Sequence, residues 1–230
     1  MLNDIGVVIP AYENQTVLSQ ALRSLARQKA QPSEVVVVDD GSATPLHLDF
    51  ASQWFSRSTK LQLLRTQTNG GPAAARNLGV SATSSSVICF LDHDDLAHPR
   101  KLERQMICLQ QGAEVVVPLS QSFTQLSEGF NPVVFGEPYV LPISLMLKRT
   151  LFDRLGGMKE VFGGDDMQLL MSARLSGARI TILDEVLTYR RVGRSNLSLK
   201  IDRRRAMLGA VKAAVHHSRN GRDVESSRET

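Results

Sequence analysis

The sequence predicts an α/β fold built on a largely parallel sheet. Through residue 117, short apolar stretches rich in β-branched residues alternate with stretches of helical periodicity. Strands that alternate with helices favour parallel pairing with right-handed crossovers. The chain has 230 residues, of which 42% are hydrophobic, so it can bury the core of a single domain.

The expected elements follow from these apolar patterns. Strands are predicted at residues 5–9, 34–38, 61–64, 86–91 and 113–117, and Pro10 is expected to stop the first of them. Helices are predicted at 15–28 and 73–80, and a third begins at Pro99, with Leu102, Met106 and Leu109 facing inward. Residues 46–55 are less periodic and could form a further helix.

The pattern changes after residue 117. Residues 118–142 contain four prolines and predict loops with short antiparallel strands at one edge of the sheet. Short helices are expected at 150–155 and 165–175, and short strands at 180–182 and 186–190. A basic helix is predicted at 202–217, before a polar tail.

Composition excludes several classes of protein. The net charge is only +4, its excess gathers near the C-terminus, and aromatic residues make up 5%, so no nucleic-acid interface is expected. The two cysteines, Cys89 and Cys108, are expected to be reduced. An apolar run of about 18 residues and a secretion signal are both missing, so a cytoplasmic location is expected.

Two predicted strands end in adjacent acids. Asp39 and Asp40 follow the second strand, and Asp92, Asp94 and Asp95 follow the fourth. Ligands of open parallel sheets bind beyond the carboxyl ends of the strands, so these acids should share one cleft. Oxygen ligands favour Mg²⁺ or Mn²⁺ over zinc, although solvated Asp-rich turns are the alternative. Dinucleotide and P-loop glycine motifs are missing, which leaves a nucleotide with a metal-bridged diphosphate as a plausible ligand.

Four stretches, in their order and spacing, resemble family 2 glycosyltransferases, which are nucleotide-sugar-dependent and generally inverting. They are residues 8–14, 36–42, 69–79 and 90–95, with weaker similarity through 155–157 and 163–166 to Tyr189 and Arg190. The resemblance implies a GT-A fold, a Rossmann-like mixed, mostly parallel sheet flanked by helices. It further implies one domain over 1–230, with a nucleotide-sugar-binding half (1–117), an acceptor-binding half (118–200) and a basic C-terminal helix and tail (201–230).

The resemblance also assigns roles to residues by position. Asp39 would accept the base N3–H, which favours uracil or thymine, and Asp40 would hold the turn or assist at the base. Asp92 would hold the ribose or a metal-bound water, while Asp94 would ligate Mn²⁺ or Mg²⁺ with Asp95 in support. The full set of expected nucleotide-sugar-binding residues is Pro10, Ala11, Tyr12, Glu13, Asp39, Asp40, Arg76, Asp92 and His93, the last as the spacer of the D-x-D motif.

The pair Asp165 and Asp166 corresponds to the family's catalytic acids. Asp166 would be the general base that takes the proton of the acceptor hydroxyl, with Asp165 as its neighbour on the acceptor or sugar side. An Asp pair at the start of a helix is also an ordinary cap. The implied reaction transfers a hexose or N-acetylhexosamine from a UDP-sugar, or less favourably a dTDP-sugar, to the hydroxyl of an unknown glycan, lipid-linked sugar, peptide or small molecule.

The chain departs from the family pattern at Met158, at residues 167–172 and at Val192. One hypothesis is that Arg190, Arg191 or Arg194 replaces a positive contact to the diphosphate. The basic helix could make peripheral contact with an anionic membrane, or could present a solvated face. Two other functions stay open, an aspartyl-nucleophile phosphohydrolase and a non-catalytic nucleotide-sugar-binding protein.

Overall fold

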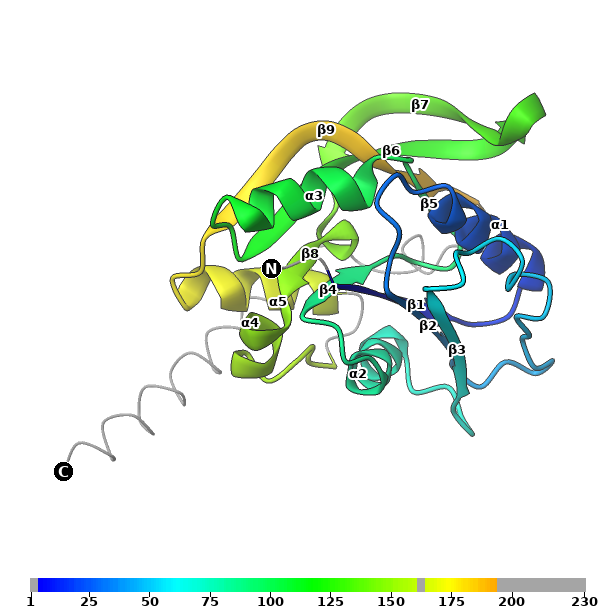
Figure 1. The fold of residues 1–230 in the computed structure, drawn as a ribbon, viewed down its shortest axis with the longest axis horizontal. Helices are drawn as coiled ribbons and strands as arrows, with labels where there is room; N and C mark the ends of the chain where they lie inside the picture. The colour runs from blue at the N-terminus through cyan, green and yellow to red at the C-terminus, as the bar shows by residue number, and fades with distance from the viewer. Residues whose placement is uncertain (1–3, 161–163, 194–230) are drawn as a thin grey trace.

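A computed structural model describes residues 4–160 and 164–193. These residues form one mixed sheet of nine strands (Figure 1). The strands are β1 (Ile5–Ala11), β2 (Glu34–Asp39), β3 (Lys60–Arg65), β4 (Val87–Phe90), β5 (Leu96–Ala97), β6 (Val115–Ser127), β7 (Asn131–Val140), β8 (Met146–Lys148) and β9 (Ile180–Arg191). Their spatial order is β3-β2-β1-β4-β8-β6-β9-β5, and β7 pairs with β6 beside this path.

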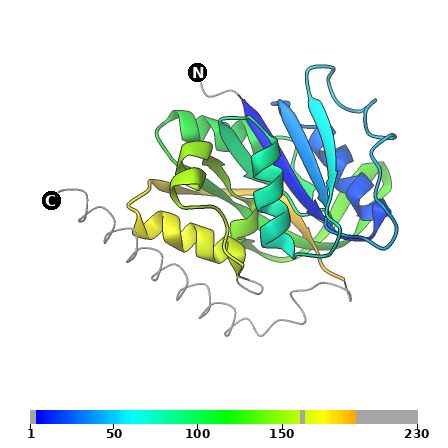
Figure 2. The same ribbon diagram turned by 90° about the horizontal axis from the view of Figure 1, so that it is seen from below.

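Helices cover both faces of the sheet, as expected for an α/β fold. The α-helices of the described residues are α1 (Gln15–Ala26), α2 (Pro72–Ala82), α3 (Lys101–Gln110), α4 (Arg149–Arg154) and α5 (Asp165–Leu175). Side chains alternate along β1, so Val7 and Ile9 pack with α1 and α3, whereas Val8 packs with α2. Figure 2 shows α2, α4 and α5 together over the second face.

The close packing of α2 depends on Gly79. A Cβ atom built on this residue would lie 2.4 Å from Cγ1 of Val8 and 3.2 Å from Cγ2 of Val38. The helix therefore rests directly on β1 and β2, and a larger residue would force them apart. This contact fixes the height of α2 above the sheet, and with it the position of the side chains that α2 carries.

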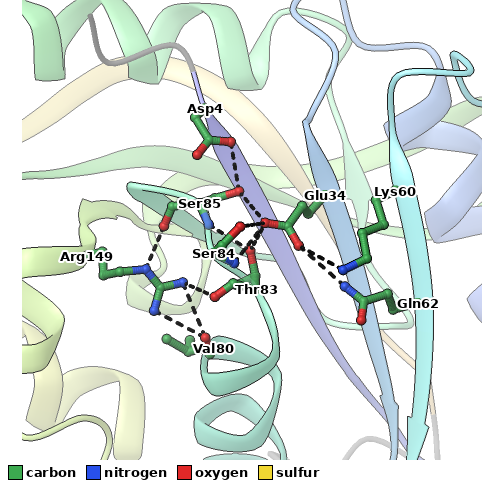
Figure 3. Close-up of polar contacts among 9 residues, drawn as sticks. All are labelled: Asp4, Glu34, Lys60, Gln62, Val80, Thr83, Ser84, Ser85 and Arg149. Atoms are coloured by element: carbon green, nitrogen blue, oxygen red, sulfur yellow. Dashed lines mark hydrogen bonds and ion pairs between the residues drawn. The ribbon is translucent and has the colours of Figure 1, made fainter.

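A polar network holds the amino end of β2 (Figure 3). One carboxylate oxygen of Glu34 accepts hydrogen bonds from the Thr83 hydroxyl at 2.8 Å and from the backbone N–H of Ser84 at 2.8 Å. The Arg149 guanidinium donates to the backbone carbonyls of Ser85 at 2.6 Å and Thr83 at 2.7 Å. The network ties β2 to the loop after α2, at the opposite edge of the sheet from the acids.

The prediction that Pro10 stops the first strand is wrong, because β1 runs to Ala11. The carbonyl of Val8 accepts from the N–H of Leu91 on the β4 side, and the carbonyl of Ala11 accepts from the N–H of Asp40 on the β2 side. This alternation turns the nitrogen of Pro10 toward β4, whose pairing with β1 has already ended at Val8. The missing N–H therefore costs no bond of the sheet.

Residues 46–55 do not form the expected helix and run through a series of turns. Leu46, Ala51 and Phe55 are buried in the core on the α1 side. Hydrogen bonds hold the start of the segment, since the N–H of Leu46 donates to Asp39 and the N–H of His47 donates to Gln15.

Residues 118–160 and 164–193 are more regular than the proline content predicted. The antiparallel strands expected within 118–142 are confirmed, but β6 and β7 form them as one long hairpin, and residues 180–191 form one strand in place of two short ones. The pairing of β6 with β9 is irregular around residues 118–120, where the register between the two strands shifts. The structure also adds β5 and β8, two antiparallel strands that are too short to leave a pattern in the sequence.

Several expectations fall outside the described residues. These are the basic helix at 202–217, its membrane contact, and the suggested role of Arg194. Across residues 4–160 and 164–193, none of the helices is both long and apolar enough to cross a membrane.

Candidate active site

The carboxyl ends of the central strands bring the predicted residues to one edge of the sheet. Ala11 at the end of β1 pairs with Asp39 at the end of β2, and Val8 pairs with Phe90 at the end of β4. The turn after β1, the Asp39–Asp40 pair and the acids after β4 therefore lie side by side, as parallel pairing predicted.

Asp39 is fully buried and organises the loop after β2. Its carboxylate accepts hydrogen bonds from the N–H of Ser42 at 3.0 Å and of Leu46 at 3.2 Å, and pairs with Arg65 at 2.5 Å. Burial acts to raise the pKa of Asp39, but the hydrogen bonds from these donors outweigh it and lower the pKa below its ordinary value. The carboxylate is therefore ionised and held in place, and its contact with a nucleotide base stays a prediction.

Asp40 holds the loop that begins α2. One oxygen accepts from the N–H of Gly70 at 3.0 Å and from the hydroxyl of Thr66 at 3.1 Å, and the other accepts from the N–H of Gly71 at 2.8 Å. The α2 helix starts at the next residue, so Asp40 sets where the helix enters the site.

The turn after β1 is strained and braced from the β2 loop. Glu13 and Asn14 adopt left-handed backbone angles, with φ of 56° and 55°, which non-glycine residues rarely adopt. The N–H of Glu13 donates to the Ser42 hydroxyl at 2.7 Å, and its carboxylate accepts from the N–H of Ala43 at 2.8 Å. Tyr12 is 47% exposed beside them. Pro10 and Ala11, by contrast, are buried within β1.

Arg76 connects the two halves of the site. It is buried on α2, and its guanidinium pairs with Asp92 at 2.6 Å and with Asp165 at the start of α5. Burial acts to lower the pKa of Arg76, but the charges of Asp92 and Asp165 raise it overall, so the guanidinium stays charged. The Nε atom has no hydrogen-bond partner among the described residues. The arginine thus holds the acids after β4 against the helix that carries the predicted base.

The carboxylates of Asp94 and Asp95 repel each other. Burial and the charge of Asp92 raise the pKa of Asp94, and burial together with Asp94 and Asp92 raises the pKa of Asp95 well above its usual range. A divalent cation would relieve this repulsion, so the residues present fit Mg²⁺ or Mn²⁺. In the described part of the chain, no group of three or more His, Cys, Asp or Glu side chains forms a ready metal site. Such a cation would therefore need ligand oxygens from the substrate or water.

Asp166 lies partly buried at the start of α5, beside Asp165. Its carboxylate accepts from the N–H of Met167 at 2.8 Å. Burial and the charge of Asp165 raise the pKa of Asp166 to about 6, despite the opposing effect of Arg76. A carboxylate of that pKa is ionised at neutral pH, yet basic enough to accept a proton.

The structure adds Arg65, which the sequence interpretation missed, and shows what surrounds two residues that it had named, Arg191 and His93. Arg65 pairs directly with Asp39, and a signal was present, because Arg65 follows the predicted third strand at the same edge of the sheet. Arg191, suggested as a diphosphate contact, donates from its N–H to Asp95 and from its side chain to the carbonyl of Asp94. His93 is partly exposed in the same loop.

A mixed α/β sheet with acids gathered at the ends of its central strands is the GT-A fold of glycosyltransferases. Solved structures share it. TarS 1–349 of S. aureus, in complex with UDP-GlcNAc, matches with a TM-score of 0.65 at 22% identity, over 85% of this chain and 60% of that one. The mannosyltransferase PcManGT of Pyrobaculum calidifontis, in complex with GDP-Man and Mn²⁺, matches with a TM-score of 0.71 at 19% identity, over 92% and 64%.

Residues 6–162 match the family model of Glycosyl transferase family 2, and the chain belongs to that family. An uncharacterized glycosyltransferase of Haemophilus influenzae is 33% identical over 122 residues, which are 53% of this chain and 48% of that protein. The pre-mycofactocin glycosyltransferase of Mycobacterium tuberculosis is 27% identical over 199 residues, 77% of this chain and 40% of that protein. The chain therefore spans about half of these relatives or less.

Proposed function

We propose that this chain transfers a hexose or N-acetylhexosamine from a UDP-sugar, or less favourably a dTDP-sugar, to an acceptor hydroxyl with inversion. The observation that carries the proposal is the position of Arg76 between Asp92 and Asp165. This contact supports a shared site, because Asp165 is the chain neighbour of the proposed base, Asp166, and Asp92 is one of the acids that would hold the donor. The acid loop, which is the stretch after β4 that carries Asp92, Asp94 and Asp95, and the base would then act on the same anomeric carbon, as a single displacement needs.

The donor would lie along the carboxyl ends of β1, β2 and β4. Residues 10–13 and Asp39 would line the base pocket, and Asp92 would hold the ribose. Asp94, with Asp95 in support, would hold Mn²⁺ or Mg²⁺, which supplies Lewis-acid stabilisation of the leaving diphosphate. Support for a sugar nucleotide comes from the complexes of TarS with UDP-GlcNAc and of PcManGT with GDP-Man and Mn²⁺.

Asp166 would accept the proton of the acceptor hydroxyl as that oxygen attacks the sugar. Its raised pKa of about 6 suits a general base that works near neutral pH. Inversion needs a single displacement, so the chain would form no covalent bond to the sugar. Asp165, held by Arg76, would keep the first turn of α5 in place beside the base.

The test separates the base from the donor site. Asp166→Asn keeps the size of the side chain but cannot take the proton, so transfer from UDP-sugars with Mn²⁺ should fall by about 10²–10⁴-fold while UDP affinity is kept. Asp94→Ala should instead weaken UDP and Mn²⁺ binding, measured by calorimetry. Asp153→Asn, an exposed acid on α4, is the control. Unimpaired transfer by Asp166→Asn, or a product that retains the anomeric configuration in NMR spectra, contradicts the proposal.

The same panel tests the alternatives. Release of phosphate from a generic phosphoester without a UDP-sugar would favour the phosphohydrolase, and UDP binding without turnover on any acceptor would favour a binding protein. The family match supports neither. Acceptor identity is to be found by screening glycans, lipid-linked sugars, peptides and small molecules.

A further inference from the structure

Arg191 is the last residue of β9. It lies beside the acid loop, the stretch after β4 that carries Asp94 and Asp95. Its backbone N–H donates to the carboxylate of Asp95 at 2.9 Å, and its Nε donates to the backbone carbonyl of Asp94 at 3.0 Å. One residue therefore fixes the side chain of one acid and the main chain of the other. Both acids are the predicted metal ligands.

Arg191 is itself anchored on two further elements. One of its terminal nitrogens donates to the side-chain oxygen of Gln20 on α1 at 2.5 Å. The guanidinium carbon lies 4.5 Å from the ring centroid of Phe123 on β6, a cation–π geometry. The next residue, Val192, donates its N–H to the carbonyl of Phe123 at 2.8 Å. Because α1, β6 and β9 are packed in the fold, these contacts fix the position of the Arg191 side chain, which in turn holds the acid loop in place.

The acid loop needs such an anchor. Asp92, Asp94 and Asp95 lie within four residues between the end of β4 and the start of β5, a stretch with no helix or strand of its own to hold it. A planar guanidinium that donates in two directions holds both the loop carbonyl and Gln20 at once. A lysine ammonium has the same charge but lacks this fork.

We infer that Arg191 is a positioning residue that sets Asp94 and Asp95 for a divalent cation bound together with the donor diphosphate. The inference rests on the proposed function, and it gives Arg191 a role different from direct contact with the diphosphate. It also makes the metal site depend on the acceptor half, because the anchor comes from β9.

The experiment measures Mn²⁺ affinity by electron paramagnetic resonance, with saturating UDP, on the full chain. Arg191→Gln removes the charge and the fork, and Arg191→Lys keeps the charge alone. Changing residues that orient metal ligands typically weakens metal binding by about 10–100-fold, and we expect both variants to fall in that range. UDP affinity without metal should stay that of the wild type.

The control is Arg104→Gln, which removes an ion pair between α3 and Glu185 of β9. The Mn²⁺ affinity of Arg104→Gln should be that of the wild type. The change in its thermal midpoint shows how much stability the loss of one ion pair to β9 costs, for comparison with the Arg191 variants. If both Arg191 variants bind Mn²⁺ with wild-type affinity, the inference is overturned but the proposed function is not. Wild-type Mn²⁺ affinity in Arg191→Lys but not in Arg191→Gln also overturns the inference, because a positive charge would then be enough without the forked hydrogen bonds. Failure of the wild type to bind Mn²⁺ with UDP overturns the proposed function and the inference with it.

Discussion

Replacement of Arg76 by methionine tests whether the two halves of the site are joined through this one side chain. The guanidinium pairs with Asp92 at 2.6 Å and with Asp165, and both Arg76 and Asp165 are at most 5% exposed. Methionine keeps most of the apolar stem, so the variant mainly removes the charge. It leaves Asp165 buried without its cation.

Removing one partner of a buried ion pair costs about 3–5 kcal/mol, because the other charge stays buried and unpaired. For a chain of this size, each kcal/mol lowers the thermal midpoint by about 2–4 °C. Arg76→Met should therefore lower the midpoint by about 6–20 °C. Transfer should fall as well, since Asp92 and the first turn of α5 lose their shared anchor.

Urea unfolding measures the change in the free energy of unfolding, with Arg76→Met/Asp165→Leu as the matched double variant. If the cost comes from the unpaired Asp165, the double variant should regain most of the lost stability, because an apolar pair replaces the ion pair. A loss below about 1 kcal/mol in Arg76→Met, the level of an exposed pair, would refute the reasoning. A double variant no more stable than the single one would show that Asp165 is not the source.

Three further results are expected. If Asp166 is the base, log kcat/KM should rise with pH to a plateau above about 6, because only the ionised carboxylate accepts a proton, and a flat profile down to pH 5 would contradict this role. Glu34→Gln should cost about 1–3 kcal/mol in urea unfolding at pH 7. Burial opposes ionisation of Glu34, but its hydrogen bonds lower its pKa in the folded state. The ionised carboxylate therefore stabilises the fold above the unfolded-state pKa, and this stabilisation is lost as the pH falls through the lower folded-state pKa. The cost of the substitution should shrink in that acid range. Gly79→Ala should destabilise by about 1–3 kcal/mol in thermal unfolding, because its Cβ would overlap Val8, and an unchanged midpoint would show that α2 can lift freely.

The sequence by itself predicted most of the strands and helices up to residue 117. Alternating strands and helices predicted the parallel pairing of β1 to β4, because a strand buried on both faces leaves a long apolar run in the sequence. It also predicted that Asp39, Asp40 and the acids after β4 share an edge, since parallel strands point their carboxyl ends the same way. Those inferences need only the period of the strands and the direction of the chain.

The tertiary structure decided which side chains hold one another. That Arg76 reaches Asp165, 89 positions later in the chain, follows from the height of α2 above the sheet and from how α5 packs, neither of which leaves a local pattern. The same holds for Arg191, whose place beside Asp94 follows from the pairing of the end of β9 with β5, a strand of two residues that leaves no pattern in the sequence. Local periodicity specifies elements, but a contact between distant charges is fixed only when the packed elements set their distance.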